Sequence, residues 1–246
     1  MTEVLKMRDY KLETEKRVAF IKGKMAEAHA QGLVFGNSGG KDSALVGILC
    51  KMATDNVLAV AMPCHSKRNY GEDMDDAIAL AKAFDIPMIT VDLTETRTVL
   101  TGSIGAELSP AALSNIAPRL RMTTLYALGQ TRNALVVGTG NRSERYMGYF
   151  TKWGDGAFDL NPIADLTATE IFEFLRYLNA PLNIITKAPS AGLFEGQTDE
   201  QEMGVTYKAI DEYITTGETD PESKAIIDRY HRVSEHKRRM PTVYGE

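Results

Sequence analysis

Residues 33–43 read Leu-Val-Phe-Gly-Asn-Ser-Gly-Gly-Lys-Asp-Ser, and this stretch decides the fold. Its first three residues form a short apolar run typical of a buried strand, and residues 44–50 carry apolar positions at helical spacing. Between them, Gly39 and Gly40 allow backbone N–H groups to turn toward one oxyanion, and the following helix adds its positive N-terminal end. The stretch therefore predicts a strand, an anion-binding loop and a helix in succession.

The alternation of strand and helix continues away from this loop. Apolar residues at a period of 3.6 predict helices, and short apolar runs bounded by turn residues predict strands. The expected elements are helices over 14–30, 71–84 and 114–129 and strands over 57–61, 87–91 and 134–138. Strands that alternate with helices are typical of a parallel sheet. The sequence therefore predicts an α/β fold, a three-layer, doubly wound, Rossmann-like parallel sheet flanked by helices.

The last third of the chain is expected to be helical and peripheral. Residues 151–162 mix glycine with aromatic and charged residues, which predicts a long loop. Thr167 or Thr169 is expected to cap a helix that reaches Asn179, because Pro181 forbids its continuation.

Composition limits the classes of function. With 43% apolar and 25% charged residues and no repeat or linker, residues 1–246 are expected to form a single globular domain. The net charge of −5 argues against a surface built for nucleic acid and favours small anions as partners. Two unpaired cysteines, a charged N-terminus and no apolar run near ~20 residues predict a cytoplasmic protein without a membrane span.

The glycine loop matches neither common nucleotide-binding pattern. It is not the G-x-x-x-x-G-K-[ST] loop of Walker enzymes, nor the G-x-G-x-x-G of dinucleotide-binding sites. Asp42 follows the glycines and could hold Mg²⁺ against phosphate oxygens. A bare double-glycine loop could also be a turn whose serine or aspartate caps a helix.

A second group of residues follows the strand predicted over 134–138. It consists of Thr139-Gly140-Asn141-Arg142-Ser143-Glu144, then residues 148–156 and Asp159-Leu160-Asn161-Pro162. Together with SGGKDS, residues 115–122, Lys187-Ala188-Pro189-Ser190-Ala191 and residues 234–238, this group resembles the NAD synthetases. These enzymes belong to the N-type ATP pyrophosphatases, which split ATP into AMP and pyrophosphate while activating a carboxylate. The resemblance covers nearly the whole chain.

The resemblance implies a fold like that of adenine nucleotide alpha hydrolases and an assignment for each motif residue. Asp42 and Glu144 would hold Mg²⁺. The residues expected to bind ATP are Gly36, Asn37, Ser38, Gly39, Gly40, Lys41, Asp42, Ser43, Thr139 and Ser190. Those expected to bind deamido-NAD are Arg119, Lys152, Asp159, His236 and Lys237. Family members are typically homodimers with this substrate site at the interface.

The implied reaction adenylylates the nicotinate carboxylate of deamido-NAD and then converts it to an amide. Asp42 and Lys41 would act on ATP, and Asp155 would take the proton that ammonium must lose. About 31 residues precede the first predicted strand, too few for the amidase domain of glutamine-using relatives, so ammonia is the expected nitrogen source and no glutaminase domain is expected. One departure is Ala168, where many relatives carry a lysine that reaches ATP phosphate; Lys41 is expected to replace part of that charge.

Several alternatives remain open at this point. Arg119 and Arg121 could form a solvated helix face, Glu144 could pair with a neighbouring arginine, and Lys237 could be part of a charged run. Cys64 and His65 are interpreted as structural, because nothing supplies an oxyanion partner. The rival functions are another enzyme of the superfamily, such as the ATP pyrophosphatase subunit of GMP synthetase or a tRNA-thiolating enzyme, and a nucleotide-binding regulatory module without turnover.

Overall fold

Four parallel strands form the centre of the computed structural model, which describes residues 8–187 and 198–245. The strands are β1 (Gly32–Gly36), β2 (Val57–Ala61), β3 (Met88–Thr90) and β4 (Ala134–Val137), and their order across the sheet is β3-β2-β1-β4. Leu33 lies opposite Val57 on one side of β1 and opposite Leu135 on the other. The predicted α/β fold with a parallel sheet is confirmed.

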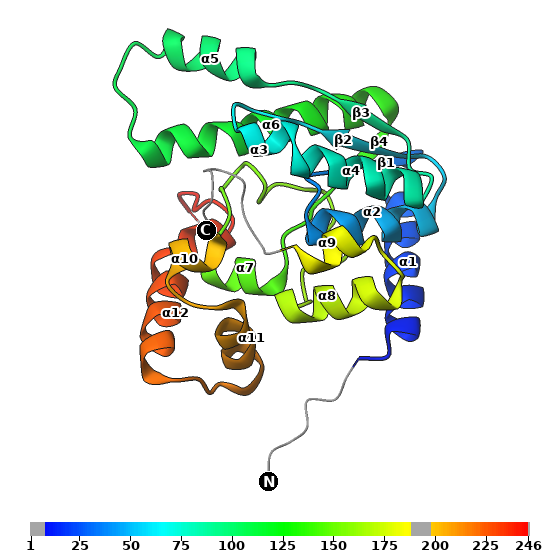
Figure 1. The fold of residues 1–246 in the computed structure, drawn as a ribbon. Helices are drawn as coiled ribbons and strands as arrows, with labels where there is room; N and C mark the ends of the chain where they lie inside the picture. The colour runs from blue at the N-terminus through cyan, green and yellow to red at the C-terminus, as the bar shows by residue number, and fades with distance from the viewer. Residues whose placement is uncertain (1–7, 188–197, 246) are drawn as a thin grey trace.

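Helices cover both faces of the sheet (Figure 1). Successive strand residues point to opposite faces, so Leu33 and Phe35 pack into one buried cluster while Val34 packs into another. The first cluster includes α1 (Tyr10–Glu27), α2 (Lys41–Ala53), α4 (Glu72–Ala83), α8 (Ala168–Tyr177) and α9 (Leu182–Thr186), and the second is covered by α6 (Pro110–Arg132). Because both faces are buried, the strands are continuous apolar runs.

The order of the strands changes direction at β1, with β2 and β3 on one side of it and β4 on the other. From β1 it passes through α2, β2 and α4 to β3, and α6 then carries it across the other face to β4, which pairs with β1. Open α/β sheets bind ligands at such a switch point, outside the carboxyl ends of the strands. The loop after β1 and the loop after β4 meet there.

A layer of helices lies beside the carboxyl end of the sheet. It contains α7 (Arg142–Met147), α10 (Asp199–Met203), α11 (Tyr207–Thr216), α12 (Pro221–Val233) and α13 (Glu235–Arg238). Met147, Tyr207 and Ile227 belong to the third buried cluster, which joins α7, α11 and α12. Ala168 at the start of α8 also packs there, so α8 connects this layer to the sheet.

Some boundaries differ from those predicted. Helix α1 begins at Tyr10 because the Asp9 carboxylate accepts hydrogen bonds from the N–H groups of Lys11 and Leu12, and it ends at Glu27. Thr167, not Thr169, caps α8, which ends at Tyr177. Residues 151–162 contain no helix, as predicted.

The sequence pattern gave no sign of the short helix α3 (Lys67–Tyr70) or of α5 (Thr94–Ser103). Helix α5 buries none of its residues, and its two large apolar side chains, Val99 and Leu100, are adjacent in the sequence and give no helical period. It is rich in threonine, and the hydroxyls of Thr98 and Thr101 donate to backbone carbonyls one turn earlier.

Two further sequence predictions concern single features. Cys50 and Cys64 are both free and buried, so the prediction of two thiols is confirmed. In the described residues, no helix has both the length and the apolar character needed to cross a membrane.

Candidate active site

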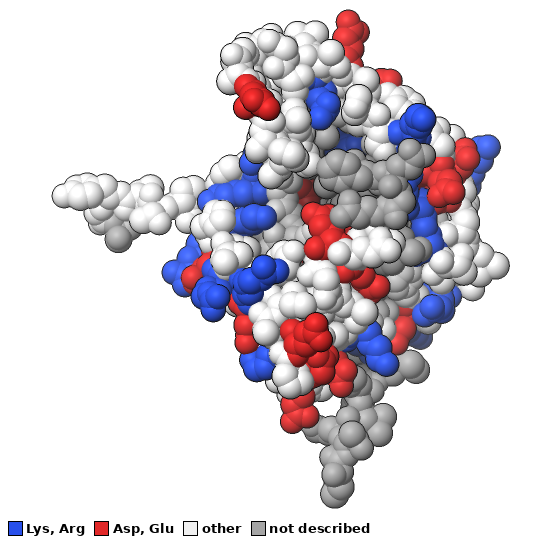
Figure 2. Space-filling model, turned by 60° about the vertical axis from the view of Figure 1, so that its left-hand side comes forward, with Lys and Arg blue, Asp and Glu red and all other residues white. Residues whose placement is uncertain are grey.

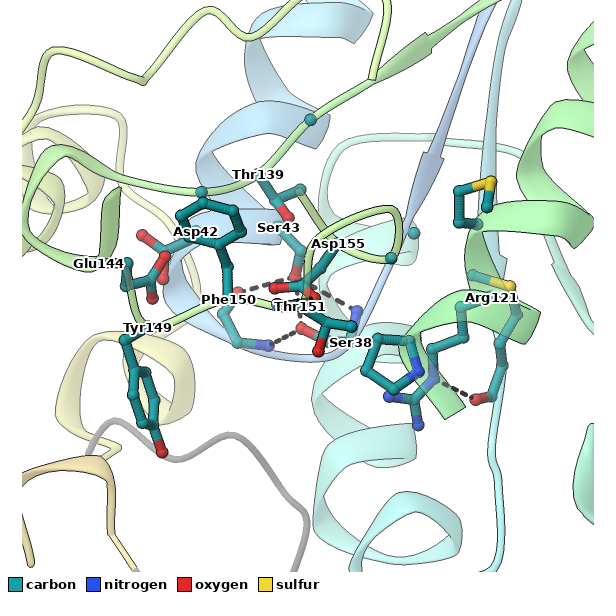
Figure 3. A pocket seen from close by; sticks show the side chains of 18 of the residues that line it. Ser38, Asp42, Ser43, Arg121, Thr139, Glu144, Tyr149, Phe150, Thr151 and Asp155 are labelled. Atoms are coloured by element: carbon teal, nitrogen blue, oxygen red, sulfur yellow. Dashed lines mark hydrogen bonds between the residues drawn. The ribbon is translucent and has the colours of Figure 1, made fainter. Parts of the chain in front are cut away.

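A cavity of about 620 Å³ opens at the carboxyl ends of β1, β2 and β4, where the order of the strands changes direction. The glycine loop, the loop after β4, α6 and the residues that follow α7 form its walls. Figure 3 shows that the side chains of Asp42, Glu144, Asp155 and Ser43 surround one space. Segments far apart in the sequence therefore bring oxygen and nitrogen groups together.

The glycine loop is held in shape by its own side chains. Gly39 has a φ of +74°, and a Cβ built there would lie 2.1 Å from the backbone oxygen of Asp73, so only glycine fits. The amide of Gly40 donates to Ser38 Oγ at 3.2 Å, and the amide of Ser38 donates to Ser43 Oγ at 3.3 Å. Gly40 is the N-cap of α2 and supplies no capping side chain. The helix start therefore faces the cavity with its amide groups, as phosphate binding requires.

Two carboxylates, Asp42 and Glu144, face the cavity and are joined by one residue. The amide of the Asn141 side chain donates to Asp42 Oδ1 at 3.0 Å, and the Asn141 backbone N–H donates to Glu144 Oε2 at 3.1 Å. Burial and the neighbouring Asp42 raise the pKa of Glu144 well above its usual value. Glu144 pairs with neither Arg142 nor Arg145, so that alternative is excluded. We call Asp42 and Glu144 the carboxylate pair.

The carboxylate pair has the oxygen atoms that Mg²⁺ prefers as ligands. The residues described contain no group of three or more histidine, cysteine, aspartate or glutamate side chains placed to hold an ion. Mg²⁺ differs from zinc in this respect, because one or two carboxylates suffice when phosphates and water complete its shell. A divalent cation here would reduce the repulsion between the two neighbouring carboxylates.

Lys41 supplies a positive charge beside the carboxylate pair. Its Nζ donates to Asp42 Oδ2 at 2.6 Å and lies over the rings of Phe172 and Tyr207, 5.8 and 5.4 Å from their centres. Burial opposes the charge, but the carboxylates of Asp42 and Glu144 outweigh it and raise the pKa of Lys41. Lys41 therefore remains protonated, with its ammonium group at the cavity wall.

Asp155 also lines the cavity, near Ser43 (Figure 3). Its Oδ1 accepts from the backbone N–H of Thr151 at 2.9 Å, and Thr151 donates its hydroxyl to Asn115 Oδ1 at 2.6 Å. The side chain is exposed to solvent within the cavity, although protein atoms surround the carboxyl group on several sides. This burial raises the pKa of Asp155.

Thr139 lines the cavity beside Gly138 and Gly140, at the end of β4. Ser190, which the resemblance placed near ATP, lies outside the described residues.

The residues expected to bind deamido-NAD are divided between the cavity and the surface. Lys237 lines the cavity, where its Nζ donates to the carbonyls of Gly148 and Phe150 at 2.9 Å, so it is not part of a solvated charged run. Arg119 is exposed and donates to the Lys152 carbonyl, while Lys152 Nζ donates to the His236 carbonyl at 2.8 Å. We call Arg119, Lys152 and His236 the surface chain. Lysine and arginine side chains gather beside a group of acidic ones on the face in Figure 2.

Asp159 belongs to neither group. Its Oδ2 accepts from the backbone N–H of Val136 at 2.7 Å, and its Oδ1 accepts from Tyr126 at 3.3 Å. These bonds attach the loop after α7 to strand β4.

Comparison with known proteins agrees with this arrangement. Residues 13–241 match the family model described as NAD synthase. The chain belongs to this family. A curated relative named NH(3)-dependent NAD(+) synthetase, from Carboxydothermus hydrogenoformans, is 51% identical over 236 residues, which cover 94% of this chain and 96% of the relative.

Two solved structures extend the comparison. An NMN synthetase from Francisella tularensis superposes with a TM-score of 0.93 at 36% identity, covering 97% of this chain and 100% of the other. An NH3-dependent NAD synthetase from Campylobacter jejuni, in complex with nitrate, superposes with a TM-score of 0.79 at 33% identity, covering 96% and 99%.

Sequence reasoning missed two cationic residues of this NAD synthase cavity. For Arg121 the sequence left a solvated helix face open as an alternative, but the residue lines the cavity and donates to the Met62 carbonyl at 3.0 Å; burial lowers its pKa. Its place four residues from both Ala117 and Leu125, on the covered side of α6, was the available signal. Lys187 also lines the cavity and donates to Asp73 at 2.8 Å and Asp76 at 2.6 Å.

Ala168, the residue at which the sequence departs from the resemblance, is fully buried. Its N–H donates to Ser143 Oγ at 3.1 Å, and its methyl group packs in the third cluster with Tyr207. The Lys41 ammonium group lies over the ring of the same Tyr207.

Proposed function

We propose that this protein is an ammonia-dependent NAD synthetase. It adenylylates the nicotinate carboxylate of deamido-NAD with ATP, releases pyrophosphate, and amidates the product with ammonia to give NAD and AMP. The observation that carries the proposal is the meeting of the glycine loop and the carboxylate pair in one cavity, at the switch point of the sheet. The names of the relatives, up to 51% identical, support the same reaction.

In the first step, a carboxylate oxygen of the substrate attacks the α-phosphorus of ATP and the bond to the β-phosphate breaks. The segment Gly36–Ser43 would bind the leaving pyrophosphate, with Thr139 and Ser190 as further ATP contacts. When bound, Mg²⁺ would neutralise phosphate charge, and Asp42 and Glu144 would hold it. No protein nucleophile is required, because positioning and charge stabilisation supply most of the acceleration.

Lys41 is proposed to replace part of the charge that Ala168 cannot supply. The two residues approach the same ring, that of Tyr207, from different elements. The buried ammonium group would contribute to ATP binding beside the pyrophosphate loop. Lys41→Met is therefore expected to raise the KM for ATP about tenfold; an unchanged KM would refute this role.

In the second step, the nitrogen of ammonia attacks the acyl carbon and the bond to the AMP oxygen breaks. Ammonium must first lose a proton, and we propose Asp155 as the acceptor. Its raised pKa and its place on the cavity wall support this role.

The deamido-NAD site is proposed to combine Lys237 in the cavity with Arg119, Lys152, Asp159 and His236, and to lie at the interface of a homodimer. Helix α5 projects from the body beside α6, the helix of Arg119 (Figure 1). It exposes Val99, Leu100 and Ile104, an apolar face that a second copy would cover.

A second candidate substrate is nicotinate mononucleotide. The observation in its favour is the TM-score of 0.93 with a structure named NMN synthetase. A mononucleotide lacks the adenylate half that would extend beyond the cavity to the surface chain. Arg119→Gln should therefore weaken use of deamido-NAD and leave use of the mononucleotide unchanged.

The test is an incubation of the purified protein with ATP, Mg²⁺, ammonium and one acceptor at a time: deamido-NAD, nicotinate mononucleotide or xanthosine monophosphate. Equal amounts of NAD, AMP and pyrophosphate are expected with deamido-NAD. A higher kcat/KM with either other acceptor would replace the substrate but keep the reaction class. ATP binding without cleavage would favour a regulatory module instead.

A further inference from the structure

A second cavity lies on the other side of α7 from the carboxylate pair. Its volume is about 350 Å³, and we call it the arginine pocket. Glu144 and Met147 line the first cavity, whereas three other residues of this six-residue helix line the second. The residues of the arginine pocket are Arg8, Arg142, Arg145, Tyr146, Ala164, Asp165, His231 and Arg238.

Positive charge dominates this pocket. Four arginines line it against one carboxylate, that of Asp165, which is paired with Arg8 at 3.1 Å. In the part of the chain that the structure describes, no carboxylate lies within 4.0 Å of the guanidinium groups of Arg142, Arg145 or Arg238. Three positive charges therefore share one concave surface with no carboxylate in ion-pair contact, and Glu235 acts on Arg238 only from a greater distance.

Hydrogen bonds hold the side chains of Arg142 and Arg238 in place without neutralising them. Arg142 donates to the Ile214 carbonyl at 2.9 Å, and Arg238 donates to the His231 carbonyl and to Ser234 Oγ, both at 2.5 Å. All three acceptors are uncharged. Burial lowers the pKa of Arg238; Glu235 opposes this effect, and the positive charges of Arg145 and Arg239 add to it. The cluster is held together although its members repel each other.

The wall between the arginines is flat and rigid. The rings of Tyr146 and His231 stack with centres 4.1 Å apart and planes 20° apart. A hydrogen bond of 2.9 Å between His231 Nδ1 and the Tyr146 carbonyl holds the imidazole in place. The pocket therefore has fixed walls with guanidinium groups from α7 and α13 around them.

We propose that the arginine pocket is a second anion site, which takes a phosphate group of a small molecule. Guanidinium groups match phosphate oxygens in pairs. Three arginines without an ion-pair partner carry more positive charge than a bound carboxylate could neutralise, so a phosphate group fits better. The net charge of −5 and the small volume favour a small anion over a polyanion. The site is separate from the proposed catalysis, so it stands whether or not the protein makes NAD.

The pocket is coupled to the carboxylate pair through α7. Arg142 and Arg145 flank Ser143 and Glu144 on a helix whose first residue is capped by Asn141. An anion that draws the two arginines together would act on the helix that positions Glu144. The pocket is thus a place where a phosphate compound can regulate the first cavity.

The test is calorimetric titration of inorganic pyrophosphate into the full chain without metal, comparing wild type with Arg145→Gln. The Arg145 side chain is exposed and makes no hydrogen bond within the described ranges, so the variant should fold normally, as its Tm would verify. The glycine loop is expected to give one binding event and the arginine pocket another. Arg145→Gln should weaken the second event at least about tenfold, and Arg145→Lys should restore it only in part.

Arg176→Gln is the matched control, since it removes the same charge from an exposed position on α8 outside the pocket. It should keep both events. The proposal is overturned if wild type and Arg145→Gln bind pyrophosphate with the same stoichiometry and affinity, or if Arg176→Gln weakens binding equally. Diffraction from a tungstate-soaked crystal provides the position, and the absence of an anomalous peak beside Arg145 would also overturn the proposal.

Discussion

The carboxylate pair and the surface chain lie near the same cavity but are held in place differently. Asp42 and Glu144 are enclosed, and Asn141 contacts both through side-chain and backbone hydrogen bonds. Arg119 is exposed, and the bonds that link the surface chain end on the backbone carbonyls of Lys152 and His236. A side chain held only by a carbonyl on the surface can be replaced at small cost, whereas an enclosed charge cannot. The comparison predicts a series of effects that decreases from the enclosed pair to the surface chain.

The largest effect is expected for Asp42→Asn. The variant removes a charge that Lys41, Asn141 and the proposed metal all use, so kcat for NAD formation should fall by about 10³-fold. Asp75→Asn, on the exposed side of α4, is the control and should retain wild-type rates. A tenth of wild-type activity in Asp42→Asn would contradict the proposed role.

Asp155→Asn tests the proposed proton acceptor in the cavity. As the acceptor of the ammonium proton, Asp155 should contribute about 10²-fold to kcat, measured under saturating ATP and acceptor.

The same substitution should raise the thermal stability of the protein at neutral pH. A carboxyl whose pKa is raised on folding stabilises the protein when protonated, and this contribution is lost as pH rises through the raised pKa. The variant should therefore have a higher Tm than wild type at pH 7, and the difference should disappear below about pH 4. If wild type and variant had the same Tm at both pH values, the pKa of Asp155 would not be raised in the folded protein.

Asn141→Ala tests the connection within the carboxylate pair. It removes the N-cap of α7 and the hydrogen bond to Asp42, so unfolding free energy should fall by about 1 kcal/mol and kcat by about tenfold. Thr206→Ala removes a cap from α11 and is the control for stability alone. If both variants lost activity equally, the effect of Asn141 would be due to stability.

The smallest effect is expected for Arg119→Gln. The KM for deamido-NAD should rise about threefold with an unchanged KM for ATP, in line with an exposed charge. Arg132→Gln, near the far end of the same helix, should change neither value. A hundredfold effect would mean that Arg119 is enclosed in the assembled dimer.

The same contrast explains what could be predicted from the sequence. The strands, the glycine loop and the placement of Asp42 and Glu144 depend on short patterns, because each loop directly follows a buried strand. The parallel arrangement then brings the two loops to one edge without further information. These features were therefore accessible from residues alone.

Other features depend on contacts between distant segments. Arg121 and Arg119 are two residues apart on α6 and point to different environments, and only the packing of α6 against the sheet decides which is enclosed. Lys187 is close to Asp73 although 114 positions separate them. Helix α5 has no buried face and so no pattern. Such features follow from tertiary packing, which a single sequence does not display.

The hydrogen bond between Asn141 and Asp42 joins residues 99 positions apart. During synthesis the glycine loop leaves the ribosome first, and strands β1, β2 and β3 can form while the segment that carries Glu144 is still being translated. Contacts over such separations form slowly, since the intervening chain must lose its freedom before they stabilise anything. A nascent chain therefore has a phosphate loop without its acidic partner, and it becomes competent to use ATP only after β4 inserts beside β1.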